Sequence, residues 1–391
     1  MVMRVSVLLE GRRSKPNSNV QIVLTPFDDY PIHQTPLPLA HPATGDPNHY
    51  DRFWFNGYTE DYYFAAGMAV YPNRGIIDGA FAVVHDGVQR SVFASGRIPA
   101  DRGETRIGPL TIEVVEPLRV TRVRADAADL GLDADVTFTA RSVALEEPRQ
   151  TLTAGTRTVM DSTRMTQWGT WSGRISAAGR ELAIDHVYGT KDRSWGVRPV
   201  GGPTPMAPDL AMPQIFFLWA PINWDDCCTH FLCFERANGD RWVGSQAVLD
   251  VIGDGDPTWN ADVRIHHLAG ATHEVRWAPG LRRSQGATLR LLRHDGTEER
   301  IELEPLITFR MRGLGYTHPE WGHGHWHGEL AVGSEEHKVD DLDNVEPWNI
   351  HIQQVMRARW GDKVGLGVLE QLAFGEHLPS GLRGLLDGYA R

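Results

Sequence analysis

Short runs of aromatic and β-branched residues, each ended by glycine, asparagine, aspartate or proline, restrict the fold of this chain more than any other feature. Residues 81–85 and 88–93 are two such runs, and they flank the pair Asp86-Gly87. An Asp-Gly pair in this setting is typical of the tight turn of a β-hairpin. In residues 348–360 the even positions are mostly apolar and the odd positions mostly polar, which predicts a strand with one solvent-facing side. Because such runs recur at intervals of roughly ten residues, the sequence predicts an all-β fold.

The domain organisation follows from length and from two unusual stretches. The 391 residues exceed one ordinary domain and fit two. Residues 201–213 hold four prolines and two glycines, which exclude a helix or a central strand. Residues 366–374 and 382–386 have helical spacing. The expected parts are an N-terminal arm (1–50), a first β-barrel (51–200), a linker or lid (201–213), a second β-barrel (214–360) and a short helical C-terminal tail (361–391).

Charge and cysteine content limit the partners and the compartment. The chain carries 39 basic and 50 acidic side chains, a formal charge of -11, which disfavours nucleic acid and anionic lipid as partners. No apolar stretch reaches the length of a membrane span or a signal-peptide core, so no membrane insertion is expected. Cys227, Cys228 and Cys233 do not form a disulfide framework and are expected to be reduced and buried. These observations predict a cytoplasmic protein.

Residues 188–199 contain the densest group of side chains suited to chemistry. Asp192 adjoins Arg193, with Trp195, Arg198 and Tyr188 close by in sequence. One interpretation is structural: Asp192 pairs with Arg193 or Arg198, and Trp195 fills a core. The other is a catalytic acid, Asp192, held beside a counter-charge and flat hydrophobic walls, with the other four residues contacting substrate.

A histidine-rich stretch is the second candidate. If residues 323–327 are extended, His323, His325 and His327 share one face, with Trp326 on the other. Three such side chains span about 13 Å, too far to hold one metal ion without help from a residue such as His318. We therefore expect no metal here. His323 and His325 are the candidate proton carriers, and His318 and Trp326 the candidate binding residues.

Aromatic residues elsewhere supply further candidate walls for a pocket. Trp54 and Tyr58 lie in the first aromatic run, and Trp219 and Asn223 lie just after the linker. Asn223 would need a hydrogen-bond partner if it were buried. Phosphate-binding loops, the nucleophile-elbow pattern and zinc-finger spacings are absent from the sequence, which disfavours phosphoryl and hydride transfer.

The segment Asp192-Arg-Ser-Trp-Gly196, placed at the end of the first of two β-rich halves, resembles the lipocalin-like family of carotenoid 1,2-hydratases (hydroxyneurosporene synthases). Kievitone hydratase-like proteins and lipocalin-type Diels–Alderases resemble it too. The resemblance implies two tandem lipocalin-like (calycin) barrels, a pocket in or between them, and no redox cofactor. The hydratases usually have histidine where this chain has Arg193, which cannot shuttle a proton near neutral pH. A downstream acid of that group corresponds loosely to Glu235.

Three functions remain open from the sequence. The first is a cofactor-independent hydratase or isomerase that protonates an apolar, unsaturated isoprenoid- or polyketide-like molecule. The second is a non-catalytic carrier of a hydrophobic ligand, and the third is a pericyclase or cyclase. In every case we expect a hydrophobic small molecule as the partner, no cofactor, and either a monomer or a homodimer.

Overall fold

The computed structural model describes residues 24–200 and 214–390. The chain divides into two units, one of residues 1–43 with 100–103 and one of residues 44–99 with 104–391. In the small unit, Asp28 of the 3₁₀ turn η1 (Pro26–Asp29) accepts hydrogen bonds from the backbone N–H groups of Thr25 and Leu39. Residues 1–23 of the expected arm and all of the expected linker or lid lie outside the described residues.

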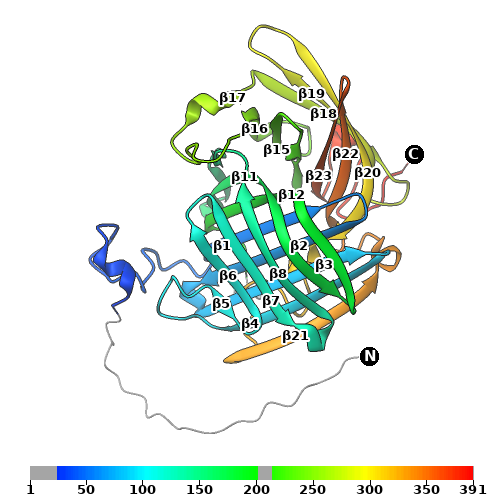
Figure 1. The fold of residues 1–391 in the computed structure, drawn as a ribbon. Coiled ribbons are helices and arrows are strands. Elements are labelled where there is room, and N and C mark those ends of the chain that lie inside the picture. The colour runs from blue at the N-terminus through cyan, green and yellow to red at the C-terminus, as the bar shows by residue number, and fades with distance from the viewer. Residues whose placement is uncertain (1–23, 201–213, 391) are drawn as a thin grey trace. The chain divides into compact units, whose positions relative to one another are not determined.

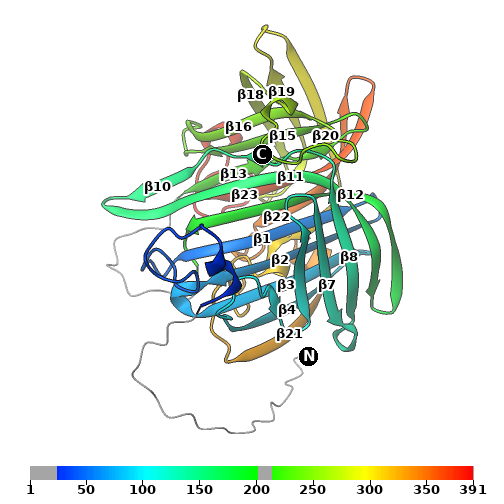
Figure 2. The same cartoon turned by 60° about the vertical axis from the view of Figure 1, so that its left-hand side comes forward.

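The large unit contains two antiparallel sheets (Figure 1). The first has 13 strands, and its main path runs β21-β4-β3-β2-β1-β12-β11-β8-β7-β6-β5. Figure 2 shows β1, β2, β3, β4 and β21 following one another in this order. The strands are β1 (His49–Tyr58), β2 (Tyr62–Tyr71), β3 (Ile76–His85), β4 (Val88–Arg97), β5 (Arg106–Ile107), β6 (Leu110–Glu116), β7 (Val120–Ala127), β8 (Leu132–Ala140), β9 (Leu145–Glu146), β10 (Gln150–Ala154), β11 (Arg157–Ala177), β12 (Arg180–Val197) and β21 (Leu330–Lys338).

The second sheet has ten strands, in the order β17-β16-β15-β13-β23-β22-β20-β19-β18, with β14 beside β15 and β23. Its two end strands are consecutive in the chain, so the sheet closes on itself through residues 265–277. The strands are β13 (Ile215–Trp219), β14 (Ile222–Asn223), β15 (Cys227–Glu235), β16 (Arg241–Asp250), β17 (Ile265–His267), β18 (Gly270–Trp277), β19 (Ser284–Leu292), β20 (Glu298–Arg310), β22 (His351–Trp360) and β23 (Lys363–Phe374).

The described residues form no α-helix, and the remaining regular elements are 3₁₀ turns. The all-β prediction with tandem barrels is therefore confirmed, and no helix of the described chain has the length and apolarity to cross a membrane. Besides η1, the 3₁₀ turns are η2 (Pro72–Arg74), η3 (Ala128–Leu130), η4 (Asp262–Arg264), η5 (Met311–Leu314), η6 (Val339–Leu342) and η7 (Leu378–Ser380).

The hairpin predicted at Asp86-Gly87 is confirmed. His85 of β3 pairs with Val88 of β4, which leaves a two-residue turn. Asp86 and Gly87 have φ values of 50° and 69°, the left-handed conformation that a tight turn between twisted strands requires at both positions.

Two local expectations were wrong. Residues 366–374, which have helical spacing, belong to strand β23, and residues 382–386 form no helix. Val368 and Leu372 of β23 face the first sheet, while Leu369 and Ala373 belong to the core of the second. Because both faces of this strand are buried, its sequence lacks the apolar and polar alternation of a half-exposed strand.

The solvent-facing side expected for residues 348–360 is also largely absent. In β22 every residue from His351 to Met356 is buried. Val355 on the expected polar side joins a cluster that packs the outer faces of the two sheets together. Trp54, Tyr63 and Phe93 contribute to this cluster from the first sheet, and Trp219 does so from the second.

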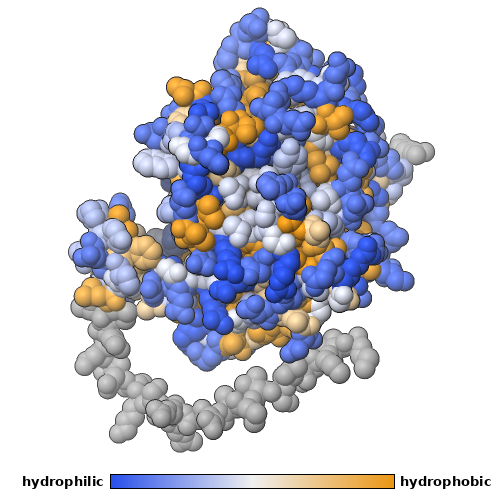
Figure 3. All heavy atoms as spheres, viewed as in Figure 1, coloured by the Kyte–Doolittle hydropathy of each residue, from blue (hydrophilic) through white to orange (hydrophobic). Residues whose placement is uncertain are grey.

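The interior of the first barrel is filled by aromatic rings. Trp171 meets Phe55, Phe64 and Phe138 at ring-centroid distances of 5.6, 5.4 and 5.2 Å, and all four side chains are buried. Polar residues cover much of the outer surface in the view of Figure 3, with apolar residues dispersed among them. A site for an apolar molecule is therefore better sought where the outer faces of the two barrels meet.

Candidate functional site between the two barrels

Side chains of successive residues in β12 alternate between two faces of the sheet, one toward the interior of the first barrel and one toward the second barrel. Arg193 faces the interior of the first barrel, where its guanidinium lies 3.7 Å from the centroid of the Phe53 ring and donates to Asp51 at 2.7 Å. Asp192 faces the second barrel, because it is paired across the strands with Trp54, a member of the inter-barrel cluster. Adjacent strand residues point to opposite faces, so the expected ion pair between Asp192 and Arg193 does not form.

The ion-pair partner of Asp192 is Arg164, on the neighbouring strand β11. The Arg164 Nε atom lies 3.2 Å from Asp192 Oδ2. The same guanidinium binds Glu147 through two hydrogen bonds of 2.7 and 3.1 Å. Its central carbon lies 5.0 Å from the centroid of the Trp219 ring, and the indole of Trp54 meets Trp219 edge-on at 5.8 Å. Asp192 thus lies beside one shared cation and two indole rings.

The two carboxyl groups around Arg164 have opposite pKa shifts. Burial raises the pKa of Asp192 to about 7, and the nearby charges of Glu147 and Glu370 add to the shift, while Arg164 opposes it. Burial also acts to raise the pKa of Glu147, but Arg164, His230 and Thr166 together hold that pKa below its ordinary value. At neutral pH the pair therefore combines an ionised structural carboxylate with a carboxyl group close to its midpoint.

A hydrogen-bond chain joins the two barrels, and it includes Glu370, whose charge acts on Asp192. Glu370 on β23 accepts from Gln353 Nε2 at 2.9 Å, and its other oxygen lies 2.7 Å from His351 Nε2. Gln353 Oε1 accepts from the Tyr63 hydroxyl at 2.6 Å and from Asn56 Nδ2 at 2.8 Å. These bonds cross from β22 to β1 and β2, so they fix the relative position of the two outer faces.

His230 is a further titratable group at the site. It lies on β15, with Nε2 3.7 Å from Glu147 Oε1 and its ring edge-on to Trp168 at 5.8 Å. Neither ring nitrogen has a hydrogen-bond partner within the described residues. Burial lowers its pKa to about 4, so the ring is neutral at pH 7.

Several expected site residues form a neighbouring cluster. The Arg198 guanidinium lies 4.6 Å from the Tyr50 ring and 5.5 Å from the Tyr316 ring, and its NH2 group is 3.5 Å from His323 Nδ1. His323 Nε2 donates to the Leu314 carbonyl at 2.8 Å. Burial, with Arg52 and Arg198, lowers the His323 pKa well below its ordinary value, so this ring is neutral and cannot donate a proton as an imidazolium.

The expected histidine face does not form, because residues 323–327 are irregular rather than extended. His323 points inward to Leu314, whereas His325 and His327 both lie near the Glu320 carbonyl, at 3.2 and 3.1 Å. The left-handed φ of 69° at Gly324 breaks the strand geometry on which the expectation depended.

His318 and Trp326 have separate surroundings. His318 Nε2 lies 2.8 Å from Glu335, and its Nδ1 accepts from two backbone N–H groups. Trp326 is 49% exposed and lies under the guanidinium of Arg97. The hydrogen bonds of His318 order a loop. Neither His318 nor Trp326 contacts Asp192.

A separate cluster between the barrels contains Tyr58, Asn223 and Tyr188. Asn223 is buried and has partners, as expected: Nδ2 donates to the Tyr58 hydroxyl at 3.0 Å, and Oδ1 accepts from Arg141 at 2.9 Å. Arg141 also lies 4.9 Å from the centroid of the Tyr188 ring.

Two further expected residues lie apart from Asp192. Trp195 shares the side of β12 that carries Arg193 and is 41% exposed. Glu235 is directed into the second barrel, where it pairs with Arg241 and His273. Glu235 therefore has its partners inside the second barrel, and its hydrogen bonds and ion pairs do not include Asp192.

The structure brings together Asp192, Trp54 and Trp219 from the expected set, and adds residues that sequence reasoning missed. The missed residues come from the loop between β9 and β10 and from β11, β15, β22 and β23, and the local signal was weak: Arg164, Thr166 and Trp168 share one side of β11. The missed residues are Arg164, Glu147, His230, His351 and Glu370.

Comparisons with known proteins agree with the two-barrel fold. Residues 24–383 match a family of unknown function, DUF8625, and the chain belongs to this family. No curated protein matched the sequence. A candidate AttH from Nitrosomonas europaea is similar in structure with a TM-score of 0.52 and 13% identity, over 83% of this chain and 92% of that one. Kievitone hydratase from Nectria haematococca is similar with a TM-score of 0.51 and 11% identity, over 82% of this chain and 88% of that one.

Proposed function

We propose that this protein is a cofactor-independent hydratase or isomerase that protonates an apolar, unsaturated small molecule of the isoprenoid or polyketide type. The observation that carries the proposal is the carboxyl group of Asp192, buried beside Trp54 and Trp219 with a pKa raised to about 7. The fold similarity to a protein named kievitone hydratase is in keeping with it.

The first chemical step is proton transfer from Asp192 to an alkene carbon. The π bond takes the proton, and the positive charge appears on the neighbouring carbon. Indole faces attract such a cation, by about 1–2 kcal/mol each when water is excluded. Arg164, 3.2 Å away, stabilises the Asp192 carboxylate that remains.

The second step regenerates the acid. Water adds to the carbocation, and the Asp192 carboxylate takes the released proton, which gives an alcohol. If the carboxylate instead removes a proton from a carbon next to the cation, the product is an isomeric alkene. The ionised Glu147 keeps Arg164 in place in both states of Asp192.

The test is turnover by the Asp192→Asn variant. The full chain would be incubated with a panel of isoprenoid and polyketide alkenes in ¹⁸O-labelled water, and products would be detected by mass spectrometry. We expect labelled alcohol or isomerised alkene from the wild type, and a loss of turnover of at least about 100-fold in Asp192→Asn. Asp51→Asn is the matched control, since Asp51 is on the paired strand but contacts Arg193 in the first barrel, and it should retain turnover.

The outcomes separate the candidate functions. Turnover by Asp192→Asn equal to that of the wild type would refute the acid role. Tight binding of an apolar probe that remains unchanged would favour a carrier, and cyclisation without incorporation of solvent atoms would favour a pericyclase. Cys227, Cys228 and Cys233 are free and buried, and we propose that the protein works in a reducing compartment such as the cytoplasm.

A further inference from the structure

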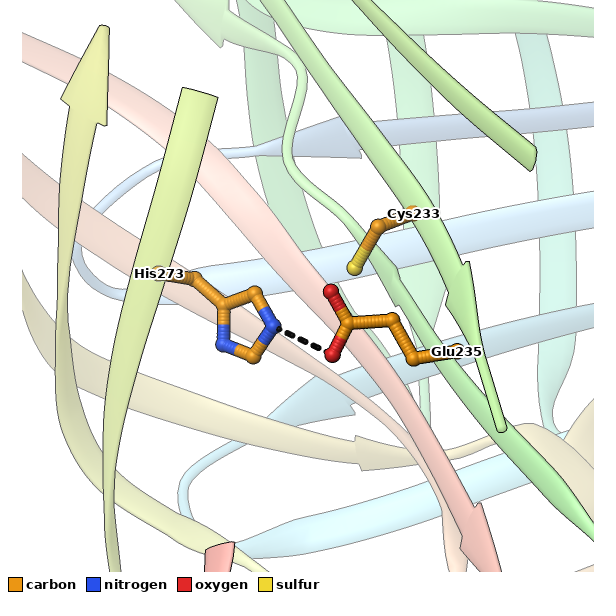
Figure 4. Close-up of side chains that lie close together, drawn as sticks. All are labelled: Cys233, Glu235 and His273. Atoms are coloured by element: carbon orange, nitrogen blue, oxygen red, sulfur yellow. Dashed lines mark hydrogen bonds and ion pairs between the residues drawn. The ribbon is translucent and has the colours of Figure 1, made fainter. Parts of the chain in front are cut away.

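A second group of reactive side chains lies inside the second barrel, away from Asp192. Cys233 and Glu235 point inward from β15, and His273 points inward from β18 (Figure 4). One donor atom from each lies within 4.8 Å of the others. His273 Nε2 is 3.1 Å from Glu235 Oε2, and His377 Nε2, from the segment after β23, is 3.2 Å from the same oxygen.

We propose that Cys233, Glu235 and His273 bind one divalent ion of the zinc class, which links β15 to β18. Three protein ligands fill three tetrahedral positions and leave the fourth to a water molecule. The proposal is independent of the chemistry at Asp192 and replaces the expectation that the protein binds no metal.

The spacing of the donor atoms suits such an ion. Zinc bonds of about 2.0–2.1 Å to nitrogen and oxygen and about 2.3 Å to sulfur place tetrahedral donors roughly 3.3–3.8 Å apart. The distance of 3.1 Å between His273 Nε2 and Glu235 Oε2 needs only a small outward shift. A mixed set of thiolate, imidazole and carboxylate favours zinc over magnesium or calcium, which prefer oxygen ligands.

The ligands are held in place by residues around them. The His377 ring stacks on Phe216 at 3.6 Å and 12°, and its Nδ1 is 2.8 Å from Ser380 Oγ. The His273 ring lies against the same phenylalanine at 5.6 Å and 22°. Outer partners of this kind orient a ligating imidazole and fix which nitrogen faces the ion.

Arg241 occupies only one side of the carboxylate. Its Nε and NH2 groups donate to Glu235 Oε1 at 3.1 and 2.9 Å. The second oxygen, Oε2, is the one that faces both histidines. Glu235 can therefore keep its ion pair and still offer an oxygen to a metal.

The test is a titration of the full chain, stripped of metal with a chelator and kept reduced, with Co²⁺ and then Zn²⁺. We expect one equivalent of Co²⁺ with a near-ultraviolet thiolate-to-cobalt charge-transfer band, displaced by Zn²⁺. Cys233→Ser should lose the band, and His273→Gln should weaken binding by roughly tenfold or more. Cys227→Ser, which alters a cysteine outside the group, should keep both the band and the affinity.

Two results would overturn the proposal. One is wild-type protein that binds no stoichiometric Co²⁺ or binds it without the charge-transfer band, a result that needs no variant and so does not depend on variant folding. The other is unchanged affinity and an unchanged band in well-folded Cys233→Ser and His273→Gln, as judged by circular dichroism. Either would leave Glu235 as the centre of a hydrogen-bond cluster only.

Discussion

Arg164 shows how one side chain can hold two carboxyl groups in different protonation states. Glu147 takes two hydrogen bonds from its guanidinium and one of 2.8 Å from the Thr166 hydroxyl, and these offset the cost of burial. Asp192 has one contact of 3.2 Å with the same cation, and burial dominates its pKa. The difference in partners, rather than in residue type, gives the two carboxyl groups opposite pKa shifts.

A raised pKa predicts a definite pH dependence of stability. Between its ordinary value of 3.8 and about 7, Asp192 binds a proton in the folded state but not in the unfolded state. Its contribution to the free energy of unfolding therefore falls as pH rises through this window, by on the order of 1.4 kcal/mol per pH unit. Asparagine does not titrate, so the stability of Asp192→Asn relative to wild type should rise over the window and level off above it. Urea unfolding at several pH values measures this, and a pH-independent difference would contradict it.

Removal of the shared cation should destabilise the fold strongly. Arg164→Gln leaves Glu147 buried and without its ion-pair partner, which typically costs about 3–5 kcal/mol. The matched control is Arg149→Gln, which removes a similar two-bond pair with Asp161 but at an exposed position, and should cost less than about 1 kcal/mol. Equal urea midpoints for the two variants would show that the Arg164 pair is not a buried one.

At the level of single residues, the sequence predicted part of the candidate site. Asp192 was recognisable from the acid and indole in its own segment, and Trp54 and Trp219 from aromatic runs. Arg164, Glu147 and His230 were not, because they reach the site from β11, from the loop after β9 and from β15, and contacts between distant segments leave no local pattern. The position of Arg193 inside the first barrel follows from simple alternation along β12.

At the scale of elements, the turns were more predictable than the faces of the strands. Asp86-Gly87 specified its hairpin through backbone conformation alone. Strand β23 was mistaken for a helix because both of its faces are buried, one in the second barrel and one against the first. The length of β11 and β12, at 21 and 18 residues, was also not predicted, since polar positions within them interrupt the apolar runs.

Aromatic rings pack closely over some strand glycines, so alanine substitutions at two different glycines should differ in their effect on stability. A Cβ atom at Gly169 on β11 would lie 2.3 Å from the Phe138 ring and 2.5 Å from the Thr139 carbonyl oxygen. Gly169→Ala should therefore destabilise the protein by about 1–3 kcal/mol. Gly270→Ala on β18, where a Cβ atom meets nothing within 4 Å, should change stability by less than about 0.5 kcal/mol. Chemical unfolding compares them, and a neutral Gly169→Ala would argue against the ring packing in the first barrel.

At the scale of the large unit, the site depends on the contact of two barrels. Neither barrel alone surrounds Asp192: the first supplies the acid, Arg164 and Trp54, and the second supplies Trp219 and Glu370. The sequence predicted two barrels but not that β21, from residues 330–338, would join the first sheet. Burial of the outer faces explains how a surface of one barrel becomes a desolvated site.

The protonation state of Asp192 tests the account most directly. Infrared difference spectra between wild type and Asp192→Asn, recorded from about pH 5 to pH 9, isolate the signal of this one carboxyl group. We predict the carbonyl band of a protonated acid at low pH, replaced by carboxylate bands with a midpoint near 7. Carboxylate bands at every pH in this range would mean that Asp192 is an ionised structural partner of Arg164, and would contradict its role as the proton donor.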